Sequence, residues 1–212
     1  MTTRLSLYND ALLLAGERPL ASLSESREPR RLLDQVWTSD GVKKCLEMGQ
    51  WHFAMRTVQV DYDPAIEPDF GYSRAFDKPT DWVLTAALCS DEYFREPLLS
   101  YSDEAGYWYS DEDTIYLRYV SDDEDYGLDL NKWPKTFEDY VAADFASNIF
   151  LKLSSDLDRT TYLINLAKTR LSMAKNKSAM ADPTKIPARG MWSRARQRGI
   201  RNDRGNIGGD LY

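Results

Sequence analysis

The spacing of hydrophobic positions changes twice along the chain. Near both ends they recur every three or four residues, which predicts helices, and in the middle they alternate with polar residues, which predicts strands. The pattern predicts an α+β fold with a helical body from residues 1–56 and 133–180 and an antiparallel β insertion from residues 57–132. After about residue 181 the periodicity stops, and residues 181–212 are expected to form a flexible C-terminal arm.

Two helices are predicted in the first part of the body. The first places four apolar residues on one face, namely Leu5, Tyr8, Leu12 and Ala15. Gly16 then predicts its end, because glycine adopts the left-handed conformation of a C-cap. One long helix is expected to follow, with Ser24 or Ser26 as its N-cap, a weak point at Gly41 and an end near Gly49.

The middle of the chain is rich in Tyr, Trp, Val, Ile and Leu. Five short runs fit strands of a small antiparallel meander, namely TVQVDY, DWVLTAALC, EPLLSY, AGYWYS and TIYLRYV. The stretch between the first two, which contains several prolines, is expected to be a loop. The acidic stretches SDEAG, SDED and SDDEDYG are expected to be hairpin turns.

Two further helices are predicted after residue 133. Apolar residues repeat every fourth position in the first of them, at Phe137, Val141, Phe145 and Ile149. Thr136 and Asp139 suggest a capping box at its start. The apolar face of the second contains Leu163, Leu166, Ala167, Leu171 and Ala174, and its other face becomes basic from Lys168 onward.

Charge is segregated along the chain, although the net charge is only −7. Residues 103–139 contain twelve acidic and three basic side chains, whereas residues 168–204 contain eleven basic and two acidic ones. Fields of opposite sign on one molecule suit nucleic-acid binding or self-association, because complementary patches steer encounters. The plainer alternative is two solvated surfaces without a partner.

Sites of chemistry are not evident in the sequence, and no catalytic, cofactor-binding or metal-binding residue is predicted. Cys45 and Cys89 lie in different predicted elements and are expected to be reduced core thiols. His52 stands between two aromatic residues and is interpreted as a packed structural residue. The acids of residues 122–125 lack the ligand spacing of a calcium loop and are interpreted as a solvated turn. Because no apolar run is long enough to span a bilayer and no signal peptide is evident, a soluble protein is expected.

Several stretches together resemble one family. They are GQWHFAMRTV, FGYSRAFDKPTDWVL, TIYLRYVSD followed by WPKTFEDYVAADFASNIF, and RGMWSRARQRG. In this order they resemble motifs of the head-to-tail adaptors of short-tailed phages, the family that includes tail tubular protein A and related gene-transfer-agent adaptors. Each motif is loose, but together they are spread over most of residues 5–198.

The resemblance implies a structural protein of the virion rather than an enzyme. Family members form a ring, typically of twelve copies, that docks beneath the portal protein and presents a platform for the next tail or nozzle protein. DNA passes through the axis of the ring without sequence-specific binding, and no cofactor or membrane is involved. The expected location is therefore the head–tail junction of a phage assembled in the host cytoplasm.

The family motifs supply the candidate functional residues. Trp51 and Phe53 are expected to project to one side of an extended segment and pin the sheet to the helices, and Pro79 is expected to set the start of a strand at Trp82. Trp133 belongs to the same group of structural residues. The residues of the arm that are expected to bind the portal are Trp192, Arg194, Arg196, Arg198, Arg201, Arg204 and Tyr212.

Two other functions remain open from the sequence. The basic arm also suits a DNA-binding virion protein, in which arginines contact phosphates and Trp192 stacks on a base. An adaptor with peptidoglycan hydrolase activity would require a pair of carboxyl groups, and spacing alone selects no such pair.

Overall fold

The computed structural model describes residues 2–68, 71–154 and 156–181, and residues 1, 69–70, 155 and 182–212 lie outside the description. The chain divides into two units, Met1–Ala181 and Asp182–Tyr212. Within the first unit, helices and small antiparallel sheets form the α+β fold that the sequence predicts. The predicted arm falls almost entirely outside the described residues.

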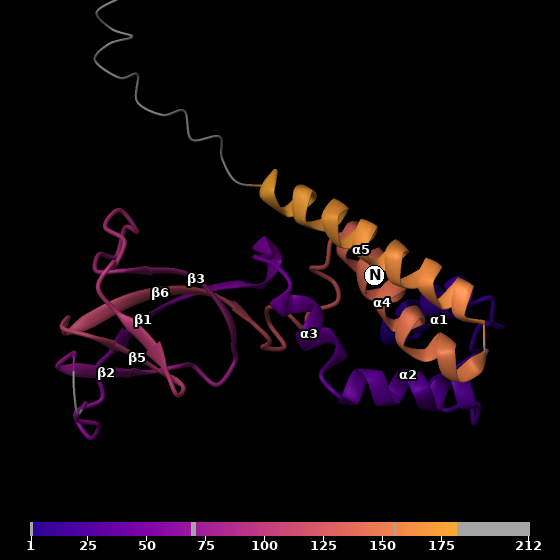
Figure 1. Ribbon diagram of the computed structural model, residues 1–212, viewed down its shortest axis with the longest axis horizontal. Helices are drawn as coiled ribbons and strands as arrows, with labels where there is room; N and C mark the ends of the chain where they lie inside the picture. The colour runs from indigo at the N-terminus through magenta and orange to yellow at the C-terminus, as the bar shows by residue number, and fades with distance from the viewer. Residues whose placement is uncertain (1, 69–70, 155, 182–212) are drawn as a thin grey trace, which may run out of the picture. The chain divides into compact units, whose positions relative to one another are not determined.

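Five α-helices are described in the first unit, with bounds α1 Arg4–Ala15, α2 Glu28–Thr38, α3 Gly41–Glu47, α4 Lys135–Leu153 and α5 Leu157–Ala179. The last two run side by side and make the most extensive contact between helices, and α1 and α2 both pack on α4 (Figure 1). Helix α4 therefore lies at the centre of the helical body. Its predicted apolar repeat is confirmed, since Phe137, Val141, Phe145 and Ile149 are all buried.

The ends of the N-terminal helices differ in part from the sequence expectation. Gly16 caps α1 in the left-handed conformation, as predicted. The single long helix is wrong, because the chain breaks between α2 and α3 where Asp40 adopts a φ of 60°. A side chain at Gly41 would place its Cβ 2.5 Å from the carbonyl oxygen of Val36, so the close return of the chain requires glycine there.

The predicted caps of α2 and α4 are also wrong. Arg27 occupies the N-cap of α2 and Pro134 that of α4, and neither has a side-chain capping bond. Asp139 forms an ion pair with Lys135, at 3.2 Å, instead of completing a capping box. The first turn of α4 is instead stabilised by the backbone carbonyl of Pro134, which accepts from the N–H groups of Phe137 and Glu138, and by the ion pairs of Lys135.

The strands form two antiparallel sheets and not one meander. In the first, β6 (Thr114–Ser121) lies between β1 (Met55–Asp61) and β3 (Trp82–Cys89). In the second, β5 (Tyr107–Ser110) lies between β2 (Arg74–Asp77) and β4 (Ser102–Glu104). Consecutive strands can belong to different sheets: β1 pairs with β6 in the first sheet, whereas β2 pairs with β5 in the second.

Several details of the predicted strands need correction. Strand β2 falls in the stretch that was expected to be a loop. Most of EPLLSY forms no strand and contributes a single bridge from Pro97 to Cys89. SDEAG supplies β4 as well as the turn after it, and SDDEDYG leads from β6 toward α4 rather than into another strand. Strands β2 and β4 contain charged residues, so they lack the alternation of apolar and polar positions by which a strand is predicted.

Two hydrophobic clusters stabilise the first unit. The larger joins the helices and includes the junction with β1, whereas the smaller lies within the β insertion and contains Phe76, Leu88, Trp108, Ile115, Leu117 and Tyr119. Each cluster is built around buried aromatic rings, which remove large apolar areas from water. Insertion and helical body therefore have cores of their own.

Gly127, between β6 and α4, offers a test of this packing. A Cβ there would lie 2.1 Å from the carbonyl oxygen of Ser121 and 2.8 Å from Cδ1 of Leu46. We expect Gly127→Ala to lower the free energy of unfolding by about 1–3 kcal/mol, because backbone must move to admit the methyl group. Urea denaturation measures the change.

A contrasting substitution serves as the control. Ala105 has a φ of 48° in the turn between β4 and β5, a conformation that glycine adopts more easily. Ala105→Gly should leave stability unchanged or raise it by up to about 1 kcal/mol. Equal stability of Gly127→Ala and the wild type would contradict the close packing at Gly127.

Candidate functional site

The family-like aromatic residues meet around one ring, that of Phe137 in the first turn of α4. Its centroid lies 4.7 Å from that of Trp51, 4.8 Å from that of Phe53 and 4.9 Å from that of Trp133. These residues come from the end of the N-terminal helices, the start of the β insertion and its end. One aromatic cluster therefore joins the two points at which the chain leaves and re-enters the helical body.

Local structure at this junction differs from the expected extended segment. Residues His52–Ala54 form a short 3-10 helix, and Trp51 lies just before it with its side chain buried. The indole N–H of Trp51 donates to the carbonyl of Leu46 at 3.0 Å, and that of Trp133 donates to the carbonyl of Gly127 at 2.8 Å. Both tryptophans thus satisfy their polar atom while they pack on Phe137.

Pro79 lies in the turn that precedes β3. Its carbonyl accepts a hydrogen bond from the backbone N–H of Trp82 at 3.0 Å, and β3 begins at that tryptophan. The position of the strand start agrees with the sequence expectation, although the expected role of Pro79 in setting it stays a prediction.

His52 is exposed rather than packed among aromatic rings. A nitrogen of its ring lies 3.1 Å from the hydroxyl of Ser178, and its backbone N–H donates to the same hydroxyl at 3.3 Å. Ser178 in turn donates to the carbonyl of Gln50. The contacts fasten the last turn of α5 beside the aromatic junction.

Asp81, which no sequence pattern distinguishes, is the centre of a polar cluster in the β insertion. Its carboxylate accepts hydrogen bonds from Arg56 at 2.9 Å, from the Tyr119 hydroxyl at 3.0 Å and from the Ser121 hydroxyl. Burial alone would raise the pKa of Asp81, but the three hydrogen bonds outweigh it and hold this pKa below its usual value. The carboxylate ties the turn before β3 to β1 and β6.

The acidic stretch after β6 is only partly a solvated turn. Asp122 forms an ion pair with Lys43 of α3 at 2.8 Å, and its hydrogen bond raises the pKa of that lysine. Asp123 lies 4.0 Å from Arg56. Asp122 therefore connects the stretch after β6 to α3, and Asp123 lies near β1, whereas Glu124 and Asp125 are exposed.

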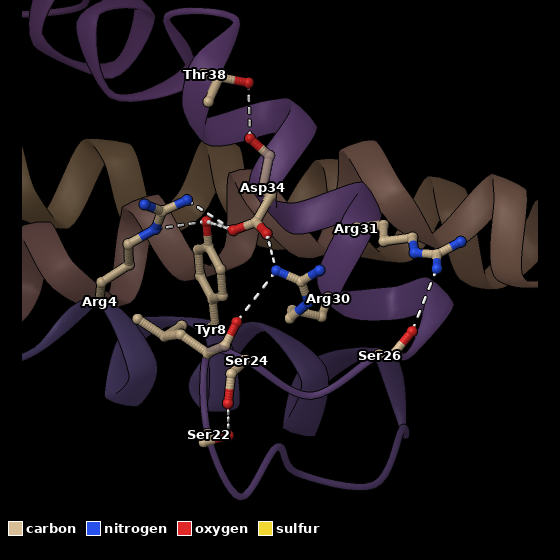
Figure 2. Close-up of polar contacts among 10 residues, drawn as sticks. Arg4, Tyr8, Ser22, Ser24, Ser26, Arg30, Arg31, Asp34 and Thr38 are labelled. Carbon is tan, nitrogen blue, oxygen red and sulfur yellow. Dashed lines mark hydrogen bonds and ion pairs between the residues drawn. The ribbon is translucent and has the colours of Figure 1, made fainter.

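A third polar cluster joins α1 to α2 (Figure 2). The carboxylate of Asp34 accepts from Arg4 at 2.6 Å, from Arg30 at 2.6 Å and from the hydroxyl of Tyr8 at 3.0 Å. Burial raises the pKa of the Tyr8 phenol, so this group stays protonated and donates. With its carboxylate fully paired, the cluster suits structural fastening better than proton transfer.

The two cysteines are not among the residues of these clusters, and the predicted portal-binding residues lie outside the described residues. Cys45 and Cys89 are buried free thiols, as expected, and burial raises the pKa of Cys45 to about 12. The predicted portal-binding residues Trp192, Arg194, Arg196, Arg198, Arg201, Arg204 and Tyr212 all lie outside the described residues. The cluster around Asp81 could not be predicted because its donors come from two distant strands; of the donors to Asp34, only Arg30 is near in sequence, and Arg4 and Tyr8 come from a separate helix.

Within the described part of the chain, no three His, Cys, Asp or Glu side chains converge as a metal site would require. None of the helices described there has the length and apolar content needed to cross a membrane.

The chain was also compared with known proteins. No protein-family model and no curated protein matches it.

The Asp81 cluster generates a prediction about acid stability. Because the folded-state pKa of Asp81 is lowered, its carboxylate stabilises the fold above a pH of about 4, and that contribution is lost as the pH falls through the lowered pKa. We expect Asp81→Asn to cost about 1–3 kcal/mol at neutral pH, since an amide cannot accept from all three donors as strongly. The loss should shrink in acid.

The measurement is urea denaturation at several pH values. Asp125→Asn is the matched control, because Asp125 is an exposed acid on the nearby connection after β6. A constant difference between Asp81→Asn and the wild type from neutral pH down to about 2 would contradict the assigned role.

Proposed function

We propose that this protein is a structural head-to-tail adaptor of a tailed phage, which forms a ring beneath the portal and connects it to the tail. The proposal rests chiefly on the ordered resemblance to the adaptor family. Three of the residues that carry the resemblance, Trp51, Phe53 and Trp133, surround one ring at the junction between helices and sheet. A motif whose members meet at one fold-defining point supports a shared architecture better than scattered matches do.

Segregated charge gives a second, weaker support. The β insertion carries most of the acidic excess, and α5 contains five basic residues and one acidic residue. Opposite patches on one chain favour ordered contacts between copies, because each copy can present a different patch to each neighbour. In a ring, each copy contacts its two neighbours through two different surfaces.

The basic segment 182–212 is proposed to bind the portal. Its sequence combines Trp192 with arginines at positions 194, 196 and 198, which together suit an aromatic anchor with a charged rim on a protein surface. Repeated around a ring, even weak single contacts would add up to firm attachment.

Deletion of residues 182–212 tests the portal contact. We expect the shortened chain to lose co-sedimentation with purified portal rings, whereas unfolding of the remaining unit should be unchanged because all of its described core lies before residue 182. Trp192→Ala should weaken attachment about tenfold or more if this residue is an anchor. Undiminished attachment of the shortened chain would contradict the proposal for this segment.

A further variant of the same segment separates the adaptor from a DNA-binding protein. A variant with Arg194→Gln, Arg196→Gln and Arg198→Gln is compared with the wild type by gel shift on duplex DNA at two salt concentrations. Strong duplex binding that falls steeply with salt and disappears in this variant, combined with unchanged portal attachment, would favour the DNA-binding alternative.

A further inference from the structure

An apolar stripe runs along the outer side of α5. Tyr162, Met173 and Met180 are exposed, and Leu166 between them is half-buried. Leu166, Met173 and Met180 are spaced seven residues apart, and Tyr162 lies four residues before Leu166. All four therefore lie on one face of the helix. The adjoining face, with Leu163, Ala167 and Ala174, is buried in the helical body. We call the four residues the helix stripe.

Basic residues accompany this stripe at a regular distance. Arg159, Arg170 and Lys177 lie three positions before Tyr162, Met173 and Met180, respectively, so they line one edge of the stripe. Two of them also contact α4: the guanidinium of Arg170 donates to the carbonyl of Asp139 at 2.9 Å, and that of Arg159 lies 5.6 Å from the ring centre of Phe150. The helix as a whole has five basic residues and one acidic residue, Asp158. The stripe therefore offers an apolar strip with a positive rim, a combination that suits an apolar partner with a negative rim.

A surface of this complementary kind lies on the loop between β3 and β4. Leu99 is 91% exposed and Tyr93 is 69% exposed. Between residues 90 and 104 the chain carries five acids, namely Asp91, Glu92, Glu96, Asp103 and Glu104, and one basic residue, Arg95. We call residues 90–104, which comprise this loop and β4, the acidic loop.

The acidic loop has a defined backbone shape. The carboxylate of Asp91 accepts from the backbone N–H groups of Arg95 and Glu96, at 2.9 and 2.8 Å. Phe94 adopts a φ of 55°, which is rare for a bulky residue, and the guanidinium of Arg118 lies 4.5 Å from the centre of its ring. Because these contacts fix the loop, Tyr93 and Leu99 can bind with little loss of conformational entropy.

We infer that the helix stripe of one copy binds the acidic loop of a second copy of this chain. Neither surface is covered by the part of the chain that the structure describes, since their apolar side chains are exposed there. Like charges disfavour contact of one stripe with another or of one loop with another, so each surface pairs with the other kind. Residues 182–212 are a poor occupant of the stripe, because they carry seven basic residues against three acidic ones.

Pairing of two different surfaces has a geometric consequence. Each copy binds one neighbour through its stripe and another through its loop, a head-to-tail arrangement that closes into a ring or continues as a filament. The inference rests on the proposed adaptor function for its biological setting and identifies the contact between adjacent copies of the ring.

The experiment uses two variants, each altered on one surface. The helix variant carries Tyr162→Gln and Met173→Gln, and the loop variant carries Tyr93→Gln and Leu99→Gln. Both variants should fold because the four replaced side chains are exposed, and glutamine is also a good helix former at the two positions in α5. Leu13→Gln is the control, because Leu13 is 76% exposed on α1 and belongs to neither surface.

Sedimentation velocity measures self-association of the full chain. We expect the wild type and Leu13→Gln to associate alike, and each surface variant to associate at least about tenfold more weakly. Added salt should weaken the wild type, because the rims of the two surfaces carry opposite charges. An equimolar mixture of the helix and loop variants should form dimers and nothing larger, since one intact stripe meets one intact loop.

Three results would overturn the inference: a wild type that stays monomeric at the highest attainable concentration, surface variants that associate like the wild type, or a mixture that remains monomeric. Portal co-sedimentation distinguishes these from failure of the proposed function. Attachment to portal rings without contact through these surfaces would leave the adaptor proposal standing, whereas self-association without portal attachment would leave only the contact between copies.

Discussion

The packing of Trp51, Phe53 and Trp133 around Phe137 is the contact on which the rest of the structure depends. At this point the N-terminal helices end, the β insertion begins and ends, and α4 starts. The rings lie at offset and edge-to-face distances that favour aromatic attraction beyond simple burial. The two indole N–H groups bond to backbone carbonyls, so no polar cost offsets the packing. Val83 of β3 and Val120 of β6 belong to the same hydrophobic cluster and extend the contact between helices and sheet.

Polar contacts add further links between the elements that meet at the aromatic cluster. Asp81 collects donors from β1 and β6, and Lys43 reaches from α3 to Asp122 beyond the end of β6. In the helical body Asp34 links α1 to α2 through two arginines and a tyrosine. The carboxylates of Asp81 and Asp34 are partly buried and each accepts from three donors, whereas Asp122 forms a single ion pair with Lys43. The acidic character of the chain is thus used for internal connections as well as on its surface.

Sequence reasoning found what short-range periodicity encodes and missed what depends on distant partners. The four-residue repeat of α4 was enough to predict its buried face, and Gly16 was enough to predict the end of α1. The crossing of the chain between two sheets could not be predicted, because β2 is short and its pairing with β5 is not encoded in its own pattern. Asp81 escaped notice for the same reason, since its three donors are spread from residue 56 to residue 121. Trp51, Phe53 and Trp133 stood out in the sequence as aromatic residues, but nothing in their spacing indicated that they would meet around Phe137.

The register of β1 and β6 has a further consequence for how this protein can change. Met55 at the start of β1 pairs with Val120 near the end of β6, so the inserted region leaves and rejoins the helical body at adjacent points. A segment whose ends lie side by side and whose interior has its own hydrophobic cluster can lengthen, shorten or be exchanged while the body keeps its geometry. Divergence among proteins built this way should concentrate inside the insertion. The helical body and its aromatic cluster would then diverge more slowly, while changes in the insertion alter the contact surfaces.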